Sequence, residues 1–421
     1  MKRVALLVCV SLSFAGVVLA GDGSVLSAKG AGAFTSFASD RSAGMGNSGL
    51  ALLGNGYLSR LNPATWSALS NVQFTATYAF SGVSSQDKIG GMSSYDANGN
   101  FGGGIFAMPL DRSLGFTLAA GFTPLTSHVY KISSSQPATS SIPASSFERN
   151  GDGGLGEGFV GASIAPARWL SVGAMFNYAF GRTESTDIVS FQDANYFSSY
   201  SDNSVYLRGP GGSVGIVLSD LNELTKLDFL SGLSVAGYFK TPYNLNGNYE
   251  LRNIYVDGLD TTFSQSATGY IPPEYGFGIA KKFNDRLTAV LDVRTQALSK
   301  YQDTFTPAGS LKDALFLGGG IEYFQGREIG SLYQKRILRA GFYYQRTQFV
   351  LPTKSGQDKQ VDELFVTAGI EFPLSFSSTV DVSAQYGFRG LSSDFLLQEK
   401  IFRLYVSVTM GEAWFVRPEG E

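Results

Sequence analysis

The chain has 421 residues, and only 16% of them are charged, whereas 43% are hydrophobic and 13% aromatic. Its 32 basic and 35 acidic residues leave a net charge of -3, and no basic stripe runs along the sequence, so nucleic acid is not an expected partner. Glycine fills 51 positions, and an ordinary soluble enzyme carries more charge than this composition provides.

The first twenty residues have the pattern of a secretory signal peptide. Lys2 and Arg3 precede an apolar run that ends in small residues at Ala20. A single membrane anchor is the alternative, but the run is short and is interrupted by two serines and a glycine. We therefore expect cleavage after residue 20. The only cysteine, Cys9, lies in this segment, so the mature chain is expected to have neither disulfides nor thiol chemistry.

The rest of the chain alternates between apolar and polar residues. In residues 72–81, Val72, Phe74 and Tyr78 belong to one face, and small or polar residues form the other. Such runs reach the roughly 9 to 11 residues that cross a bilayer at a tilt, and no later segment has 18 consecutive apolar residues. The pattern predicts an all-β fold, a transmembrane antiparallel β-barrel that resides in a Gram-negative outer membrane.

Fourteen strands are predicted within a barrel spanning residues 70–411, followed by a tail of residues 412–421. Long outer loops are expected at residues 126–153 and 183–204, and short periplasmic turns at residues 111–113 and 284–285. Residues 245–256 also have strand character, but counting them would make the total odd, so we place them in a hairpin extension of an outer loop. The predicted strands are 72–81, 99–109, 113–123, 156–166, 169–181, 205–218, 230–241, 271–283, 286–298, 312–325, 335–347, 361–373, 378–389 and 399–411.

Residues 21–69 lack strand alternation and are predicted to form a partly helical hatch inside the barrel. Asn62 and Pro63 are a helix-start signal, because Asn accepts hydrogen bonds from the first turn and Pro suits the first helical position.

At this segment the chain also resembles a known family. The stretch GNGYLSRLNPATW, with Ser59, Arg60, Asn62, Pro63 and Ala64, resembles the hatch of FadL-type long-chain fatty acid transporters and the N-terminal segment of the related PorV-like barrels. The FadL resemblance implies a hatch inside a 14-stranded barrel, with apolar small molecules entering from outside and leaving sideways into the lipid bilayer. The PorV resemblance implies the alternative, a structural or secretion-associated barrel that binds exported proteins.

A weak stretch of wall is predicted beside the hatch. Glycine has no side chain to pack and proline supplies no N–H, so both weaken a strand ladder. We expect a lateral opening there, with Asn62 and Pro63 anchoring the hatch beneath it; close packing of the hatch against the glycines is the alternative. The candidate residues are Gly102, Gly103, Gly104, Pro109 and Pro124.

Charged residues on the polar face of the later strands are predicted to line the lumen. A structural role, holding the hatch by ion pairs and hydrogen bonds, is favoured over substrate selection. The residues are Asp292, Arg294, Arg339, Glu371, Asp381, Arg389 and Arg403.

The sequence gives little support for catalysis or for cofactor binding. His128 is the sole histidine, which rules out multi-histidine metal sites and leaves one base for any hydrolytic triad; we interpret it as an exposed loop residue. Residues 151–156 match a nucleotide-binding glycine pattern, but they precede a strand and not a helix. We predict no enzyme activity, no metal and no cofactor, and uptake of hydrophobic molecules such as long-chain fatty acids.

Overall fold

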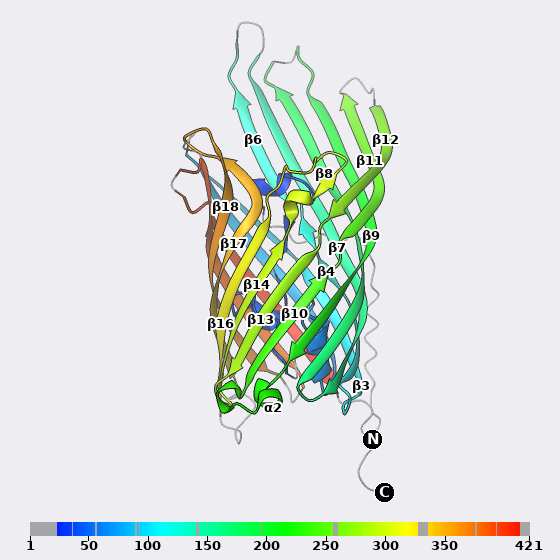
Figure 1. Ribbon diagram of the computed structural model, residues 1–421. Coiled ribbons are helices and arrows are strands. Elements are labelled where there is room, and N and C mark those ends of the chain that lie inside the picture. The colour runs from blue at the N-terminus through cyan, green and yellow to red at the C-terminus, as the bar shows by residue number, and fades with distance from the viewer. Residues whose placement is uncertain are drawn as a thin grey trace, which may run out of the picture.

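The computed structural model describes residues 23–412, apart from 36, 55–56, 89–90, 92, 140–142, 194, 256–259, 327–335, 375–376 and 393. The predicted signal peptide and residues 413–421 of the predicted tail lie outside the described residues. The described chain forms a closed antiparallel barrel of fourteen wall strands, as predicted (Figure 1).

Every predicted strand corresponds to a strand of the wall, and each neighbouring pair is antiparallel. Three wall strands are built from two consecutive pieces. In chain order the wall consists of β2 (Val72–Asp87), β3 (Ser93–Asp111), β4 (Phe116–Pro124) with β6 (Tyr130–Gln136), β7 (Ser145–Ala167), β8 (Leu170–Phe191), β9 (Ser199–Leu218), β10 (Leu233–Lys240) with β11 (Tyr243–Tyr255), β12 (Asp260–Ile271) with β13 (Glu274–Lys282), β14 (Leu287–Gln296), β16 (Ala314–Gln325), β17 (Arg336–Pro352), β18 (Asp358–Pro373), β19 (Thr379–Arg389) and β20 (Leu397–Glu412).

Strand β11 is not an additional membrane strand. It continues β10 after Thr241 and Pro242, pairs with the outer half of β9, and forms a hairpin with β12. Pro272 and Pro273 separate β12 from β13 in the same way. Proline has no N–H to donate to a ladder, so it interrupts a strand. Both interruptions lie where the wall strands pass from the barrel into its outer extension.

The two faces of the wall follow the period-two pattern. Phe74 and Tyr78 point outward and are exposed, while Thr75 and Thr77 point inward and are buried. Thr75 and Thr77 hydrogen-bond to Thr409 and Ser407 on β20, so β2 and β20 close the barrel both through the ladder and through side chains. An apolar outer surface and a polar interior are the arrangement expected of a barrel in a membrane.

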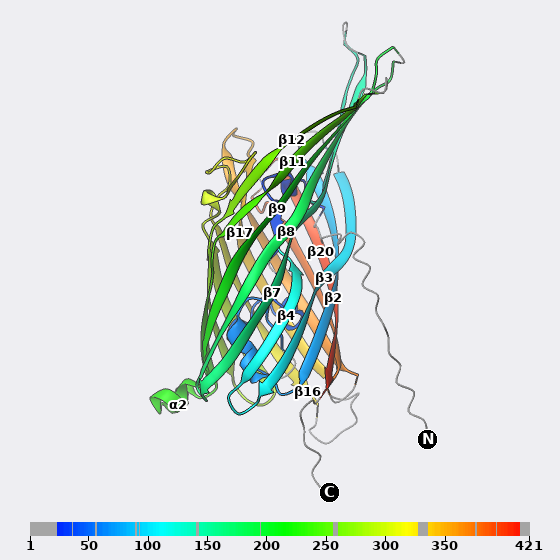
Figure 2. The same cartoon turned by 90° about the vertical axis from the view of Figure 1, so that its right-hand side faces the viewer.

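The long outer loops predicted at residues 126–153 and 183–204 are mostly strand, which corrects the sequence interpretation. Strands β6, β7, β8, β9, β11 and β12 continue past the rim as a tall curved sheet on one side of the barrel (Figure 2). Many side chains on this extension of β8 are partly exposed on both faces. A sheet wetted on both faces needs no alternation, so the periodicity used for the wall strands could not detect it.

The hatch lies inside the barrel, where its blue segments are visible through the wall (Figure 1). It contains η1 (Val25–Ala28), β1 (Ala33–Phe34), α1 (Asp40–Ala43) and η2 (Pro63–Ala68). Strand β1 pairs with the two-residue strand β5 (Thr126–Ser127), which lies between β4 and β6. The remaining short elements are α2 (Leu221–Thr225), η3 (Asp228–Leu230), η4 (Leu298–Lys300) and β15 (Gln302–Asp303). Within the described ranges, none of the helices has both the length and the apolar character to traverse a bilayer.

Candidate functional site: hatch, cavities and wall gap

The predicted hatch motif folds into a compact, self-bonded unit. The Ser59 hydroxyl accepts hydrogen bonds from the backbone of Leu61 and Asn62, at 3.2 and 3.3 Å. The Asn62 side chain accepts from the Ala64 N–H at 3.1 Å and donates to the Leu50 carbonyl at 2.8 Å. Asn62 is the cap of η2 and Pro63 its first residue, so the predicted helix start is confirmed, although the turn is 3-10 in type.

Asn62 and Pro63 do not lie beneath the glycines of β3, which corrects that part of the sequence hypothesis. They pack against Gly215 of β9 and Gly173 of β8 so closely that a Cβ at Gly215 would lie 1.9 Å from the Asn62 Oδ1. Trp66 of η2 stacks on Phe159 of β7, with ring centroids 6.0 Å apart. The η2 turn is thus anchored to β7, β8 and β9.

Lumen charges hold the middle of the hatch against the opposite wall. Arg41 makes two hydrogen bonds to Glu322 of β16, at 2.8 and 2.6 Å. Arg339 of β17 also contacts Glu322, at 2.9 Å, and ion-pairs with Glu371 and Asp381. A buried arginine surrounded by carboxylates can saturate its five donors, which is what makes a buried ion-pair cluster tolerable.

Two further lumen residues bond to the hatch backbone. The Asp292 carboxylate accepts hydrogen bonds from the N–H groups of Gly49 and Leu50, at 2.7 and 3.1 Å. Arg294 donates to the Asn47 carbonyl at 3.4 Å and lies over the Phe316 ring, 3.7 Å from its centroid. Both residues therefore bond to the hatch, which is the kind of contact that the predicted structural role requires.

Arg389 and Arg403 lie nearer the outer end of the lumen. Arg389 bridges Glu363 and Glu399 at 2.7 and 2.8 Å, and Glu399 in turn accepts the Ser24 hydroxyl of the hatch at 2.8 Å. Arg403 donates to the Tyr343 hydroxyl at 2.8 Å. All seven predicted lumen residues face inward, and six are buried, Glu371 being partly exposed.

The wall is interrupted between β3 and the strand formed by β4 and β6. The β3–β4 ladder extends from Asp111 only to Gly104. In the part of the chain that the structure describes, residues 93–103 of β3 pair with β2 alone, and β6 pairs with β7 alone. The outer halves of two neighbouring wall strands are therefore not joined by a ladder.

The predicted glycines mark this interruption. Thr77 of β2 pairs with Gly103 and Tyr78 with Phe101, so Gly102 is an extra residue in a bulge. Gly103 has a φ of +122°, which disfavours any residue with a side chain. A Cβ at Gly102 or Gly103 would first meet atoms of the wall, from Thr77 and Phe122, so close packing of the hatch does not explain these glycines.

The two predicted prolines have different positions. Pro124 ends β4 at the interruption, and its carbonyl accepts a hydrogen bond from Arg60 of the hatch at 3.0 Å. Pro109 lies in the intact part of the β3–β4 ladder, opposite Thr117. Pro109 therefore does not border the gap, which corrects its assignment to the opening.

Two cavities adjoin each other across Phe34 and Thr35 of the hatch. The gap-side cavity extends to Asn98, Asn100 and Gly102 of β3. Its hatch wall includes Phe37, which stacks on Tyr405 with centroids 4.9 Å apart. This cavity thus connects the interior to the interrupted stretch of wall.

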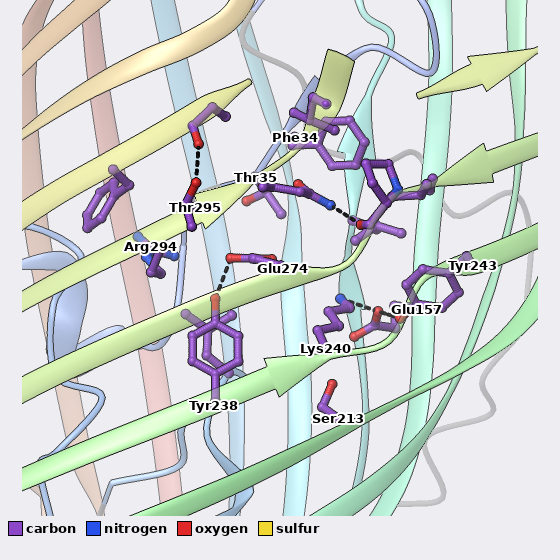
Figure 3. A pocket seen from close by; sticks show the side chains of 18 of the residues that line it. Phe34, Thr35, Glu157, Ser213, Tyr238, Lys240, Tyr243, Glu274, Arg294 and Thr295 are labelled. Atoms are coloured by element: carbon purple, nitrogen blue, oxygen red, sulfur yellow. Dashed lines mark hydrogen bonds and ion pairs between the residues drawn. The ribbon is translucent and has the colours of Figure 1, made fainter. Parts of the chain in front are cut away.

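The central cavity is more strongly charged (Figure 3). Lys240 lies 2.6 Å from Glu157, which also accepts the Tyr243 hydroxyl, and Tyr238 donates to Glu274. Arg60 and Arg294 contribute two more cations. Three cations and two carboxylates beside apolar rings can bind a molecule with a polar or anionic head and an apolar body.

Sequence reasoning missed most of the residues of the central cavity. Glu157, Lys240 and Glu274 lie in or beside predicted strands, and the parity of those strands places each on the inward face, so a systematic parity count would have found them. Phe34 and Thr35 carry no such signal, because the hatch has no period.

His128 is buried, so its interpretation as an exposed loop residue is wrong. It belongs to the segment that connects β5 to β6, and its Nε2 lies 3.1 Å from the Ser185 hydroxyl, which also contacts Tyr130 at 2.9 Å. Its Nδ1 has no hydrogen-bond partner, whereas a triad base is oriented through that atom by a third group. The glycine pattern at residues 151–156 lies within β7, a strand.

Comparison with known proteins gives one family. The family model described as BamG matches residues 1–419. The chain belongs to the BamG family. No curated protein matches the chain.

Three proteins of known structure are among those that share this fold. They are the Pseudomonas putida toluene transporter TodX (15% identity, TM-score 0.60, 89% of this chain and 98% of that chain), a Pseudomonas aeruginosa FadL homologue (14%, 0.58, 90% and 99%) and the CymD monoaromatic hydrocarbon channel (14%, 0.57, 89% and 98%). At these identities the similarity establishes a shared fold. The resemblance to FadL-type proteins is therefore confirmed for the architecture of the barrel.

Proposed function

We propose that the protein is an outer-membrane channel that takes up amphipathic molecules with an apolar chain and an anionic head, such as long-chain fatty acids. The observation that carries the proposal is the gap-side cavity, which ends at the outer half of β3, where no ladder joins β3 to β6. Fold neighbours named as transporters or channels for toluene and monoaromatic hydrocarbons support uptake of apolar compounds.

The charges of the two cavities favour a ligand with a head group over a plain hydrocarbon. Lys240, Arg60 and Arg294 border the central cavity, and Phe34, Phe37 and Tyr405 border the gap-side cavity. If the head group lies in the central cavity and the chain in the gap-side cavity, the chain points toward the gap. Glu363, Arg389 and Arg403 also border the gap-side cavity, so the chain would lie along its Phe34, Phe37 and Tyr405 side. The ligand would then leave into the bilayer without passing the ion pairs around Arg339.

An uptake assay tests the proposal. The protein is expressed in a host without its own fatty-acid channel, and uptake of a long-chain fatty acid is compared with that of its methyl ester and of toluene. We expect uptake of the acid to exceed that of the ester. A Lys240→Gln variant should lower uptake of the acid several-fold, whereas Lys131→Gln, at an exposed outer position, should not. Uptake no greater than in cells with an empty vector would refute the proposal.

A secretion-associated role is the second candidate, and the outer sheet favours it. Strand β7 has 23 residues and β8 has 22. At roughly 3.3 Å per residue, a strand of this length extends far beyond what is needed to cross a bilayer. Residues 260–266 of β12 are exposed, which leaves a polar surface for an exported protein. Shortening the β8–β9 hairpin should abolish co-purification of exported proteins while fatty-acid uptake persists; unchanged co-purification would contradict this role.

A further inference from the structure

The outer surface of the barrel has a groove over β9, β10, β13 and β14. Its floor is Gly237 of β10, which lies opposite Ile216 of β9 and Phe277 of β13. A Cβ placed on Gly237 would have no atom closer than 3.8 Å, so the position is open to the outside. The outward-facing side chains along the groove, Val214, Phe239 and Tyr275 among them, are apolar or aromatic except for Thr295.

The floor of the groove lies on the periplasmic half of the wall. Gly237 is four residues from Leu233, where β10 begins. With a rise of roughly 3.3 Å per residue and a tilt of roughly 40°, Gly237 is about 10 Å above that end. The apolar band of an outer-membrane barrel is about 25 Å tall, so the floor of the groove at Gly237 falls within the leaflet that faces the periplasm, and Phe239 and Tyr275 extend the groove to the middle of the bilayer.

A small apolar foot lies at the end of the same wall face. We use this name for residues 220–232, which contain α2 and η3 and connect β9 to β10. Its side chains Leu224, Leu227 and Phe229 are 48, 47 and 74% exposed. In Figure 2, α2 projects sideways from the barrel at its lower rim.

Specific contacts hold the foot on the outer surface below the groove. Lys281 continues the outward row of β13 that contains Tyr275 and Phe277, and its ammonium donates to the carbonyls of Phe229 and Ser231, at 3.1 and 2.5 Å. Asp220 accepts from the Gly232 N–H at 2.9 Å and closes the loop. Asp220 and Lys226 both have left-handed backbone, an unfavourable conformation that these contacts maintain.

We propose that this face holds a phospholipid of the periplasmic leaflet, with an acyl chain in the groove over Gly237 and its head group against the foot. The surface is continuous with the apolar outer belt, and an interfacial segment with exposed leucine and phenylalanine beside lysines is the composition that inserts at a head-group boundary. The strands that flank β10 lie about 10 Å apart, which leaves room for one chain between their side chains.

The charges around the foot suit a zwitterionic head group. Residues 220–232 and 281–286 contribute four cations, Lys226, Lys281, Lys282 and Arg286, and four anions, Asp220, Glu223, Asp228 and Asp285. Lys282 and Asp285 pair with each other at 2.9 Å, and Lys281 is bonded to the foot itself. Lys226 and Arg286 can meet the phosphate while Glu223 and Asp228 meet an ammonium group. The inference rests on the proposed membrane location, so its test includes a position that reports that location alone.

Fluorescence quenching tests the foot, because the mature chain has no native cysteine if residues 1–20 are removed. Phe229→Cys is labelled with an environment-sensitive fluorophore in phosphatidylethanolamine-rich vesicles that contain nitroxide lipids. Val366→Cys, exposed on the belt of β18, is the control for membrane insertion, and Arg112→Cys, in a periplasmic turn without a foot, is the control for lipid proximity. Shallow nitroxides should quench position 229 at least twofold more than position 112.

The outcomes separate the two proposals. Quenching at 366 without quenching at 229 would overturn the foot as a lipid-binding element, whereas absence of quenching at 366 would overturn the membrane location itself. If position 229 is protected only when another protein from the native membrane is present, the occupant is a protein and the lipid assignment is wrong.

A filling substitution tests the groove. Gly237→Leu adds a side chain that points outward, and Ala340→Leu does the same on β17, away from the groove. Mass spectrometry of the purified barrel should show at least a twofold loss of retained phospholipid for Gly237→Leu and no loss for Ala340→Leu. Equal retention by both variants, with both barrels closed and folded, would overturn the assignment of the groove.

Discussion

The hatch makes different contacts with two sides of the barrel. On the side of β16 to β20 the wall ladders are continuous apart from one irregularity in β17, and buried ion pairs around Arg339 extend to Arg41 of the hatch. On the side of β3, β4 and β6 the ladder stops at Gly104, and the hatch contributes its short strand β1 and the Arg60 side chain. The contrast indicates which part of the hatch can move.

The bonds on the two sides differ in strength. Charge-assisted hydrogen bonds in a buried site resist separation, because parting them leaves unpaired charges away from water. A two-residue ladder has few bonds to lose. We therefore expect residues 31–35, around β1, to be the moving part of the hatch, with α1, η2 and Ser24, which is bonded to the buried Glu399, remaining in place.

The largest expected loss of stability comes from removing the ion pairs on the side of β16 to β20. Arg339→Leu leaves Glu322, Glu371 and Asp381 without their common partner, which should destabilise the barrel by about 3–5 kcal/mol, as for other broken buried ion pairs. Denaturant unfolding of the detergent-solubilised barrel measures the loss. Arg336→Leu, at an exposed position of the same strand, is the matched control and should change the unfolding free energy little.

A disulfide between the hatch and the wall on the side of β3, β4 and β6 should stop transport without lowering the stability of the barrel. Ala33 and Ser127 are partners in the β1–β5 ladder, so Ala33→Cys with Ser127→Cys can form a disulfide between hatch and wall. Oxidation should abolish fatty-acid uptake, and a reductant should restore it. Each single substitution serves as the control. Full uptake by a fully cross-linked sample would rule out movement of β1.

Hydrogen exchange compares the two parts of the hatch directly. The amides of Gly49 and Leu50 are bonded to the Asp292 carboxylate inside the barrel, so they should exchange slowly. The Thr35 amide, bonded to the Leu125 carbonyl beside the gap at 3.1 Å, should exchange at least tenfold faster. Equal protection would show that the hatch moves as one body or not at all.

The smallest effect is expected at the predicted periplasmic turn between β3 and β4, which contacts neither the ion pairs around Arg339 nor the end of the ladder at Gly104. Hydrogen bonds from the Ser113 hydroxyl and from the backbone of Leu114 and Ser113 lower the pKa of Asp111 below its ordinary value of 3.8. A lowered pKa in the folded state means that the carboxylate stabilises the fold above pH 3.8 and that this contribution is lost as the pH falls further. Asp111→Ala should leave uptake unchanged and should shift the unfolding midpoint only slightly at neutral pH.

Local pattern was sufficient to predict the wall. Alternation along a strand is imposed by lipid on one side and the lumen on the other, so Phe74, Thr75 and their neighbours reveal their faces without knowledge of the fold. The same parity correctly placed Asp292, Arg339 and Arg389 in the lumen. The Asn62 and Pro63 turn was also predictable, because its cap is made by adjacent residues.

Tertiary structure alone decided where the hatch meets the wall. Asn62 was expected near Gly102 and instead packs against Gly215, because the route of an aperiodic segment depends on where the barrel leaves space and supplies partners. The outer sheet could likewise not be predicted from the sequence, because its strands are exposed to solvent on both faces and show no alternation. Alternating burial can be predicted from neighbouring residues of the sequence. The end of the ladder at Gly104, the cavities beside it and the ion pairs behind the hatch cannot, because they depend on residues up to hundreds of positions apart.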